Sequence, residues 1–369
     1  MATTFKTFLN NDKTTTKTLL HEAIPITGSI VSGTYGDNNI KNYGHGTFQS
    51  VYDYPYLSSS ANHIFDITCG YSNESGLSAS ANSPLQNTKK INIYNQMAQV
   101  LVGYDETGAI REFDEDGDLA GGTKLQEVYF INFSRLLTKD EIKKGSVSLS
   151  FATGSSPQDA VTGSGGGWMD IEDTNAQNDF RINSPAGEYG ILKVAASSSA
   201  PFAPNSNGEA PTADGKYPQN GTAVGLIYYQ AGIAVLTASI FNGTFGPMEN
   251  HPNNTGSVAA VLAGATIEDN STGLRNRMLD LSFNNTTELN STIYFCRANH
   301  NEFNYSSNPT YLTDSKLNVK NKQQDSPVSY ITTVGLYSAD NELLAVGKLS
   351  EPLKKTPETE LTIRTRLDF

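Results

Sequence analysis

Apolar and polar residues alternate through the last ten residues of the chain, ELTIRTRLDF (360–369). In an extended strand, one side carries Leu361, Ile363, Leu367 and Phe369, and the other carries Thr362, Arg364, Arg366 and Asp368. This period of two predicts a half-buried strand. Its apolar side must be covered, either by another part of the chain or by a neighbouring subunit.

The residues just before this strand predict a hairpin. SYITTVGLY and ELLAVGKL are alternating segments on either side of SADN, where Asp340 and Asn341 tolerate a left-handed backbone. Pro352 and Pro357 follow and are expected to end further pairing. We therefore expect the terminal strand to complete a three-stranded C-terminal unit, with Arg364 and Arg366 on its solvated face.

Further elements are predicted upstream. Apolar spacings of three and four favour a helix in KKINIYNQMAQVLVGY, and Thr138 with Glu141 fits a capping box for a short helix that ends at Gly145. A second hairpin, RMLDLSF and LNSTIYFCRA joined across NNTTE, is expected before the C-terminal unit, and GLIYYQAGIAVLTASIF is apolar enough for the core. Strands are predicted in HIFDITCGY, QEVYFINFSRL, SVSLSF and EYGILKVA.

Together these elements predict a β-rich α+β fold, with antiparallel, sandwich-like sheets, a few short helices and long ordered loops. We expect an N-terminal β-rich domain over 1–151 with one or two helices, and a C-terminal β domain over 224–369. Between them, 152–223 is rich in Gly, Ser, Pro and Asn and is interpreted as a loop-rich insertion.

The composition of the chain disfavours some classes of function. The net charge of −12 disfavours binding to nucleic acid or to an anionic membrane, because neutralising phosphates requires clustered Lys and Arg. No window reaches membrane-spanning length, and the N-terminal residues lack a continuous apolar signal segment, so we expect synthesis and assembly in the cytoplasm. The two cysteines, Cys69 and Cys296, are expected to be free thiols.

No catalytic, cofactor-binding or metal-ligating residue is predicted. EFDEDGDL (112–119) resembles a calcium loop, but counting from Asp114 puts Leu119 at the usual glycine and Leu125 at the usual bidentate acid, so an acidic surface turn is favoured. GSGGGW (163–168) lacks the Lys-Ser/Thr of a phosphate loop, and Cys296 with His300 has no second ligand pair nearby.

Candidate interface residues come from aromatic-rich and terminal segments. The segment 35–65 contributes Tyr52, Tyr54 and Tyr56, although an internal aromatic core explains this segment equally well. Trp168, the only tryptophan, is a further candidate, although a lone Trp often anchors its own loop. The apolar side of the terminal strand completes the set with Leu361, Ile363, Leu367 and Phe369.

Five stretches of the chain carry a resemblance to a known group of proteins: YLSSSANHIFDITCGYS, KKINIYNQMAQVLVGYDETGAIREFD, INFSRLLTKDEIKKG, YFCRANHNEFNYSSNPTYLTDSKLNVKN and SYITTVGLYSADNELLAVGKLSEPLKK. Together they resemble virion structural proteins of marine contractile-tailed phages, the T-even-like cyanophages and their relatives. The resemblance implies a non-enzymatic part of the virus particle, in the tail or baseplate, that contacts other virion proteins and symmetry copies of itself.

Other functions remain open at this point. A host-surface adhesin would read glycan or protein through loops of 152–223, where Trp168, Phe202 and Tyr217 stand among small polar residues. A hydrolase used in host entry is a further alternative, and neither it nor the adhesin accounts for the terminal strand. A head-associated decoration protein is also an alternative.

Overall fold

The computed structural model describes residues 5–27, 37–79, 84–152, 168–197, 221–241, 258–306, 312–313, 316–317, 322 and 324–369. Its contacts divide the chain into two units. Unit 1 combines Met1–Leu19 with Glu288–Phe369, and unit 2 is Leu20–Thr287. The sequence predicted a division of the chain into the consecutive segments 1–151, 152–223 and 224–369. The two units follow a different division, because strands from both sides of 152–223 enter one sheet and residues from both ends of the chain belong to unit 1.

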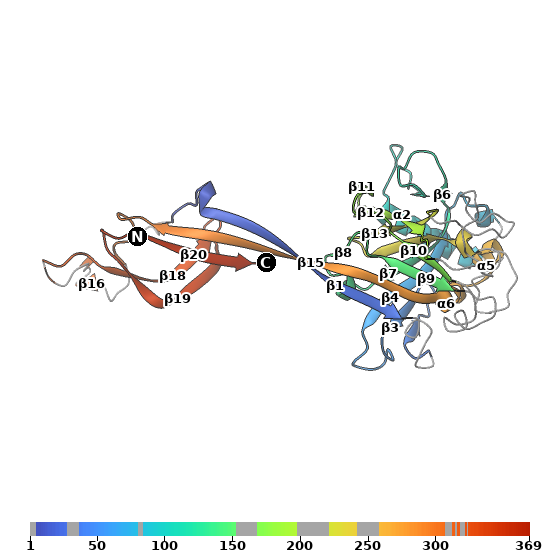
Figure 1. The fold of residues 1–369 in the computed structure, drawn as a ribbon, viewed down its shortest axis with the longest axis horizontal. Coiled ribbons are helices and arrows are strands. Elements are labelled where there is room, and N and C mark those ends of the chain that lie inside the picture. Colours follow the sequence, from blue (N-terminus) through green and yellow to red (C-terminus); the bar gives the residue numbers. More distant parts are fainter. Residues whose placement is uncertain are drawn as a thin grey trace. The chain divides into compact units, whose positions relative to one another are not determined.

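Unit 2 is built on one long antiparallel sheet (Figure 1). Its strand order is β15 (Met278–Ala298), β9 (Ser148–Ala152), β10 (Trp168–Glu172), β12 (Gly187–Val194), β13 (Ala223–Tyr228), β14 (Ile233–Thr237), β7 (Glu127–Phe133), β4 (His63–Tyr71), β3 (Gln49–Tyr52) and β2 (Ile40–Asn42). Also paired with this sheet are β1 (Lys13–Thr27), β8 (Glu141–Ile142) and β11 (Phe180–Ser184), while β5 (Phe113–Asp114) and β6 (Lys124–Leu125) pair with each other.

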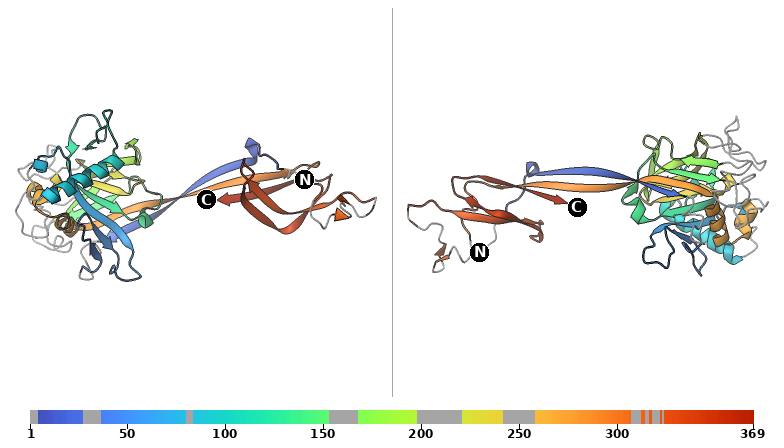
Figure 2. Two further views of the ribbon diagram at one scale, coloured as in Figure 1. Left: turned by 180° about the vertical axis from the view of Figure 1, so that it is seen from behind. Right: turned by 60° about the horizontal axis from the view of Figure 1, so that its bottom comes forward.

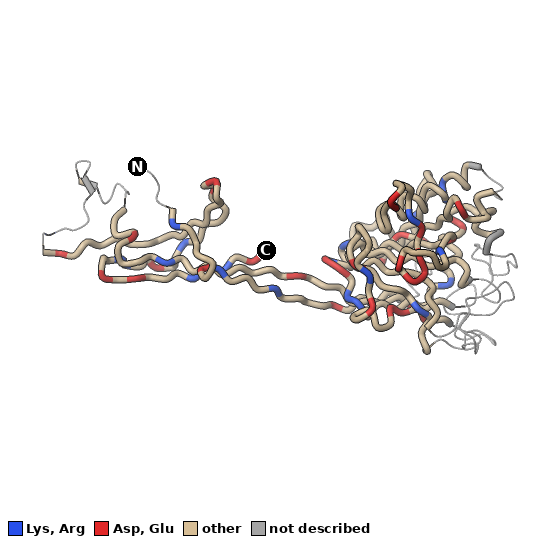
Figure 3. The backbone as a smooth tube through the Cα atoms, turned by 90° about the horizontal axis from the view of Figure 1, so that it is seen from above, with Lys and Arg blue, Asp and Glu red and all other residues tan. Residues whose placement is uncertain are grey.

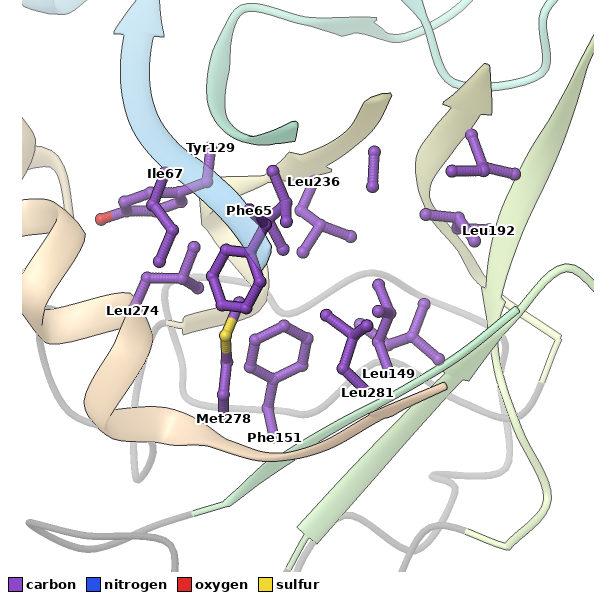
Figure 4. Close-up of a cluster of buried hydrophobic side chains, with 14 of the residues drawn as sticks. Phe65, Ile67, Tyr129, Leu149, Phe151, Leu192, Leu236, Leu274, Met278 and Leu281 are labelled. Carbon is purple, nitrogen blue, oxygen red and sulfur yellow. The ribbon is translucent and has the colours of Figure 1, made fainter. Parts of the chain in front are cut away.

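Both faces of the central strands are buried, which explains their nearly continuous apolar sequence. On β7, Tyr129, Ile131 and Phe133 enter one cluster of buried side chains, whereas Val128 and Phe130 enter a second. The first cluster joins side chains of β4 and β7 to side chains of β9 and β15, so the sheet curls over its own core (Figure 4).

Helices cover parts of the unit 2 sheet. The longest, α2 (Pro84–Leu101), lies across one face, and its buried Tyr94, Ala98 and Leu101 belong to the second cluster (Figure 2). The other helices in the described part of unit 2 are α3 (Arg135–Thr138), α5 (Val258–Gly264), α6 (Ile267–Arg277), η2 (Gly76–Ala79) and η3 (Ala238–Phe241). A capping box between Thr266 and Asp269 begins α6.

Among its described residues, unit 1 contains strand pairs in addition to β1 and β15. β20 (Leu361–Asp368) is antiparallel to residues 291–298 of β15, with Ser291 opposite Asp368 and Ala298 opposite Leu361. β18 (Ser329–Tyr337) and β19 (Leu343–Lys355) form a separate ribbon, and β16 (Leu312–Thr313) pairs with β17 (Lys316–Leu317). The short helix η1 (Asn10–Asp12) precedes β1.

Strands account for 47% of the described residues and helices for 17%, which confirms the predicted β-rich α+β class. The predicted strands at 63–71, 126–136, 146–151 and 188–195 correspond to β4, β7, β9 and β12. The predicted helix over 89–104 corresponds to α2, and the C-terminal hairpin is β18–β19, with Asn341 in the left-handed region at a φ of 63°. Within 152–223, however, β10 and β11 were missed.

The hairpin predicted across NNTTE is wrong, because residues 278–298 form the single strand β15. The buried side chain of Asn285 is hydrogen-bonded to residues that are distant in sequence. The amide of Asn285 donates to the Leu137 carbonyl at 2.8 Å and accepts from the Glu22 N–H at 3.1 Å. Turn-forming residues thus stay extended here because α3 and β1 supply the hydrogen bonds of Asn285.

The helix predicted to start at Thr138 is also wrong. Thr138 is the last residue of α3, Lys139 adopts a φ of 56° that ends the helix, and Glu141 already belongs to β8. Gly145 has the expected positive φ of 73°, but it lies in the turn before β9.

Two predictions about the C-terminal strands need correction. β19 continues through Pro352 to Lys355, and the chain accommodates the proline where the β18–β19 register shifts between Ile331 and Thr333. The terminal strand β20 pairs with β15 and not with the β18–β19 ribbon, so the predicted three-stranded unit does not form.

Candidate interaction surface and acidic loop

The β18–β19 ribbon exposes apolar side chains close to its turn. We define the β18–β19 patch as Tyr337, Leu343, Leu344 and Val346, whose exposed fractions are 43%, 55%, 67% and 64%. Val346 is opposite Gly335, and Tyr337 is opposite Leu343. A Cβ added to Gly335 would lie 2.8 Å from Cε2 of Tyr337 and 3.3 Å from Cδ1 of Leu343, so these two side chains gather over the glycine. Tyr337, Leu343 and Val346 thus share one face of the ribbon within unit 1, and Leu344 stands at the register shift between Leu343 and Ala345.

A cavity of about 490 Å³ lies beside this ribbon in unit 1. Aromatic and aliphatic side chains from the N-terminal segment, β15, β18 and β20 line it, among them Phe5, Phe8, Phe295, Val334 and Ile363. Ring contacts hold three of the lining side chains, with the Phe5 and Tyr337 centroids 4.7 Å apart and the Phe8 centroid 5.3 Å from that of Tyr294.

One charged pair borders the same cavity. Arg297 Nε lies 2.7 Å from Oδ1 of the buried Asp12, and Asp12 Oδ2 accepts the Leu9 N–H at 3.0 Å. This pair ties the N-terminal segment to β15 within unit 1. Cys296, also in the cavity lining, is a free half-buried thiol whose pKa is raised chiefly by burial.

The apolar and polar residues of the terminal strand differ in their exposure to solvent. Leu361, Ile363 and Leu367 are half-buried, while Thr362, Arg364, Arg366 and Asp368 are exposed, as the alternation predicts. The apolar side is thus partly covered within unit 1, where Ile363 lines the cavity. Phe369 remains 70% exposed, although its N–H and C=O both bond to Asn290 at 2.9 and 3.1 Å.

The predicted tyrosines lie in unit 2. Tyr52, at the end of β3, and Tyr56 are half-buried with ring centroids 6.2 Å apart, and Tyr54 is 45% exposed. His63 stacks edge-on against Tyr52 with centroids 5.5 Å apart, and burial raises the pKa of the Tyr52 hydroxyl. Trp168 begins β10 opposite Ala152, but its side chain lies outside the described residues, as do Phe202 and Tyr217. The three tyrosines thus belong to unit 2, whereas the terminal strand belongs to unit 1.

The acidic turn 112–119 is more organised than the sequence predicted. Asp114, Asp116 and Asp118 each offer a carboxylate oxygen within 4.8 Å of the other two. Asp116 and Asp118 are exposed, as expected for a surface turn, but Asp114 is buried and pairs with Lys124 at 2.7 Å. In the described part of the chain this is the sole group of three or more His, Cys, Asp or Glu side chains close enough to share a metal ion.

The other candidate metal pair is not assembled. His300 contacts Glu360 at 3.3 Å on the surface, and the Cys296 thiol bonds to Thr365 on β20. Sequence reasoning also missed the β18–β19 patch. The signal was present in ELLAVGKL, where Leu343 and Leu344 are adjacent apolar residues that cannot both face inward on a regular strand.

Comparison of the chain with protein-family models, with curated proteins and with solved structures finds no match. Among the described residues, no helix is both long enough and apolar enough to cross a membrane. Along both units, acidic and basic positions are interspersed (Figure 3).

Proposed function

We propose that this protein is a non-enzymatic structural subunit of a contractile-tailed phage particle, located in the tail or baseplate. It acts through contacts with other virion proteins and copies of itself, and it is assembled in the host cytoplasm. The observation that carries the proposal is the β18–β19 patch in unit 1, and the sequence resemblance to virion proteins supports it.

The physical argument starts from the cost of leaving such a ribbon in water. Isolated two-stranded ribbons are marginally stable, and grouped apolar side chains on a surface mark contact sites. Burying them contributes roughly 25 cal/mol per Å² of apolar area removed from water. Among the described strands, β18 and β19 pair only with each other, so the ribbon also has outer edges to which a strand of a neighbouring virion protein can add. We assign the patch and these edges to that neighbour.

Incorporation of patch variants into particles tests the proposal. Leu344→Asp and Val346→Lys place charges at exposed positions, so folding should be retained while the contact with the neighbour is lost. We expect at least a tenfold drop in the amount of protein per purified particle, measured by quantitative mass spectrometry, because a buried unpaired charge costs several kcal/mol.

The matched control is Leu57→Asp in unit 2, where a leucine that is 88% exposed lies outside the patch. This variant should be incorporated like the wild type. Normal incorporation of both patch variants, or absence of the wild-type protein from purified particles, would contradict the proposal.

A further inference from the structure

We propose that the loop Asp114–Gly122 is a calcium site in which Asp114, Asp116 and Asp118 supply the carboxylate ligands. The loop connects β5 and β6, where Phe113 pairs with Leu125 and Asp114 with Lys124. Calcium binds oxygen ligands at 2.3–2.6 Å, so oxygens around one ion are up to about 5 Å apart. The three carboxylate oxygens, all within 4.8 Å of one another, already fit around a single ion.

An unsatisfied buried oxygen points independently to a ligand. The Asp114 side chain is fully buried, and its Oδ2 is 2.7 Å from Lys124 Nζ. Its Oδ1 is also buried, yet it has no hydrogen-bond partner among the described residues. Because an unpaired buried carboxylate oxygen is costly, its presence in a folded protein requires a partner, and a cation is one.

The position of Gly122 shows where this oxygen points. A Cβ added to Gly122 would lie 3.7 Å from Asp114 Oδ1 and 4.0 Å from Asp116 Oδ2, so both oxygens face the same space. That space is open because residue 122 has no side chain. The orphaned oxygen of Asp114 is therefore directed into the acidic cluster, where an ion shared with Asp116 and Asp118 would satisfy it.

Neighbouring strands hold the loop in this conformation. The Gly117 carbonyl accepts the Tyr189 hydroxyl at 2.9 Å and the Asn183 amide at 3.0 Å, and Arg181 Nε donates to the Asp116 carbonyl at 3.3 Å. A Cβ at Gly117 would lie only 3.0 Å from Arg181 Cγ and 3.2 Å from the Tyr189 ring, and a side chain there would be strained at the φ of 71°. The ligands are thus held in place before the ion binds, which lowers the entropy cost of binding.

Leu119 and Leu125 stand where a calcium loop usually has a glycine and a bidentate acid, and they determine the Ca²⁺ affinity that we expect. Leu119 adopts the left-handed conformation that glycine usually provides, with a φ of 65°, so the turn forms despite the substitution. Leu125, where a bidentate acid usually stands, is buried in the core and offers no ligand. With three carboxylates and remaining positions left to carbonyls and water, we expect a dissociation constant for Ca²⁺ of roughly 0.1–1 mM, and weaker binding of Mg²⁺, which demands rigid octahedral geometry.

Terbium luminescence and calorimetry on the full-length chain test this site. Tb³⁺ replaces Ca²⁺ at oxygen sites, and Tyr189, bonded to the loop carbonyl of Gly117, is placed to sensitise its emission. We expect saturable emission that Ca²⁺ displaces and Mg²⁺ does not, and a Ca²⁺ affinity by calorimetry that falls at least tenfold in Asp116→Asn and in Asp118→Asn. Both aspartates are exposed, so these variants should remain folded.

The control is Glu106→Gln, which removes an exposed acid outside the cluster and should leave Ca²⁺ affinity unchanged. An unchanged affinity in both loop variants, or no saturable Ca²⁺ binding by the wild type below about 10 mM, would overturn the proposal.

Discussion

At Asp173, burial and hydrogen bonding shift the pKa of the carboxyl group in opposite directions. Its carboxylate accepts the Gly145 and Val147 N–H groups at 2.6 and 2.9 Å and the Tyr229 hydroxyl at 3.1 Å. Burial nevertheless dominates and raises its pKa to about 6, above the ordinary value of 3.8. The folded state therefore binds the proton more tightly than the unfolded chain does, and this group favours folding most at low pH.

We predict that Asp173 makes the wild type lose stability as pH rises from about 4 to about 6. A raised pKa of this size corresponds to about 3 kcal/mol. In Asp173→Asn, which cannot titrate, this contribution is absent, so the free energy of unfolding of the wild type minus that of the variant should fall across the window. Urea unfolding at several pH values measures the difference, and a pH-independent or rising difference would refute the assignment.

At the residue scale, some properties of side chains could be predicted from the sequence and others could not. The alternation in ELTIRTRLDF correctly gave the half-buried and exposed positions of β20 because they depend on a local period. The spacing of Asp114, Asp116 and Asp118 was visible as well. Nothing local showed that Asp114 is buried with one unpaired oxygen, because that depends on Lys124 and on how β5 pairs with β6.

At the scale of elements, Gly70 decides how closely α2 approaches β4. A Cβ at this position would lie 2.6 Å from the Lys90 carbonyl and 3.0 Å from the Tyr94 amide nitrogen, both on the α2 backbone. A helix backbone cannot yield as the end of a flexible side chain can. The glycine is therefore required for helix–sheet contact and not for backbone freedom.

We predict that Gly70→Ala destabilises the protein by about 2 kcal/mol or more, because α2 must shift away from the sheet. Gly347→Ala is the matched control, since Gly347 lies on β19 with nothing within 4 Å of an added Cβ. The control should change stability by less than about 1 kcal/mol. Chemical denaturation compares the two, and equal effects would show that the close approach is not what Gly70 provides.

The terminal strand gives a second prediction at this scale. Deleting residues 361–369 removes the partner of 291–298 on β15 and uncovers part of the cavity that Ile363 lines. Hydrogen exchange should become faster at the β15 amides that bond to β20, while amides shared by β13 and β14 in unit 2 keep their protection. Unchanged exchange in 291–298 would mean that β20 does not pair there in solution.

Elements were predicted best where the pattern is local and worst where partners are distant. Periodicity identified α2, β4, β7 and the β18–β19 hairpin. It failed across NNTTE because β8 and the Glu22 N–H, far away in sequence, keep Asn285 and Thr286 extended. It failed at Pro352 because a shift in register accommodates the proline inside β19.

At the scale of the whole chain, the class of fold followed from the abundance of alternating segments, but the grouping of segments did not. Unit 1 combines the two ends of the chain through β1, β15 and β20, and no sequence pattern indicates that residues so far apart share a unit. The β18–β19 patch belongs to this unit, and it provides the apolar surface on which the proposed assembly depends.

Cross-linking of intact phage particles tests this assembly most directly. Lys348 and Lys354 are exposed on β19, close in sequence to the patch, and react with amine-specific reagents. If the protein is a structural subunit bound through unit 1, mass spectrometry will find these lysines linked to lysines of another virion chain or of a second copy. The account is contradicted if the protein occurs in purified particles with only intrachain links from both lysines, or does not occur in them at all.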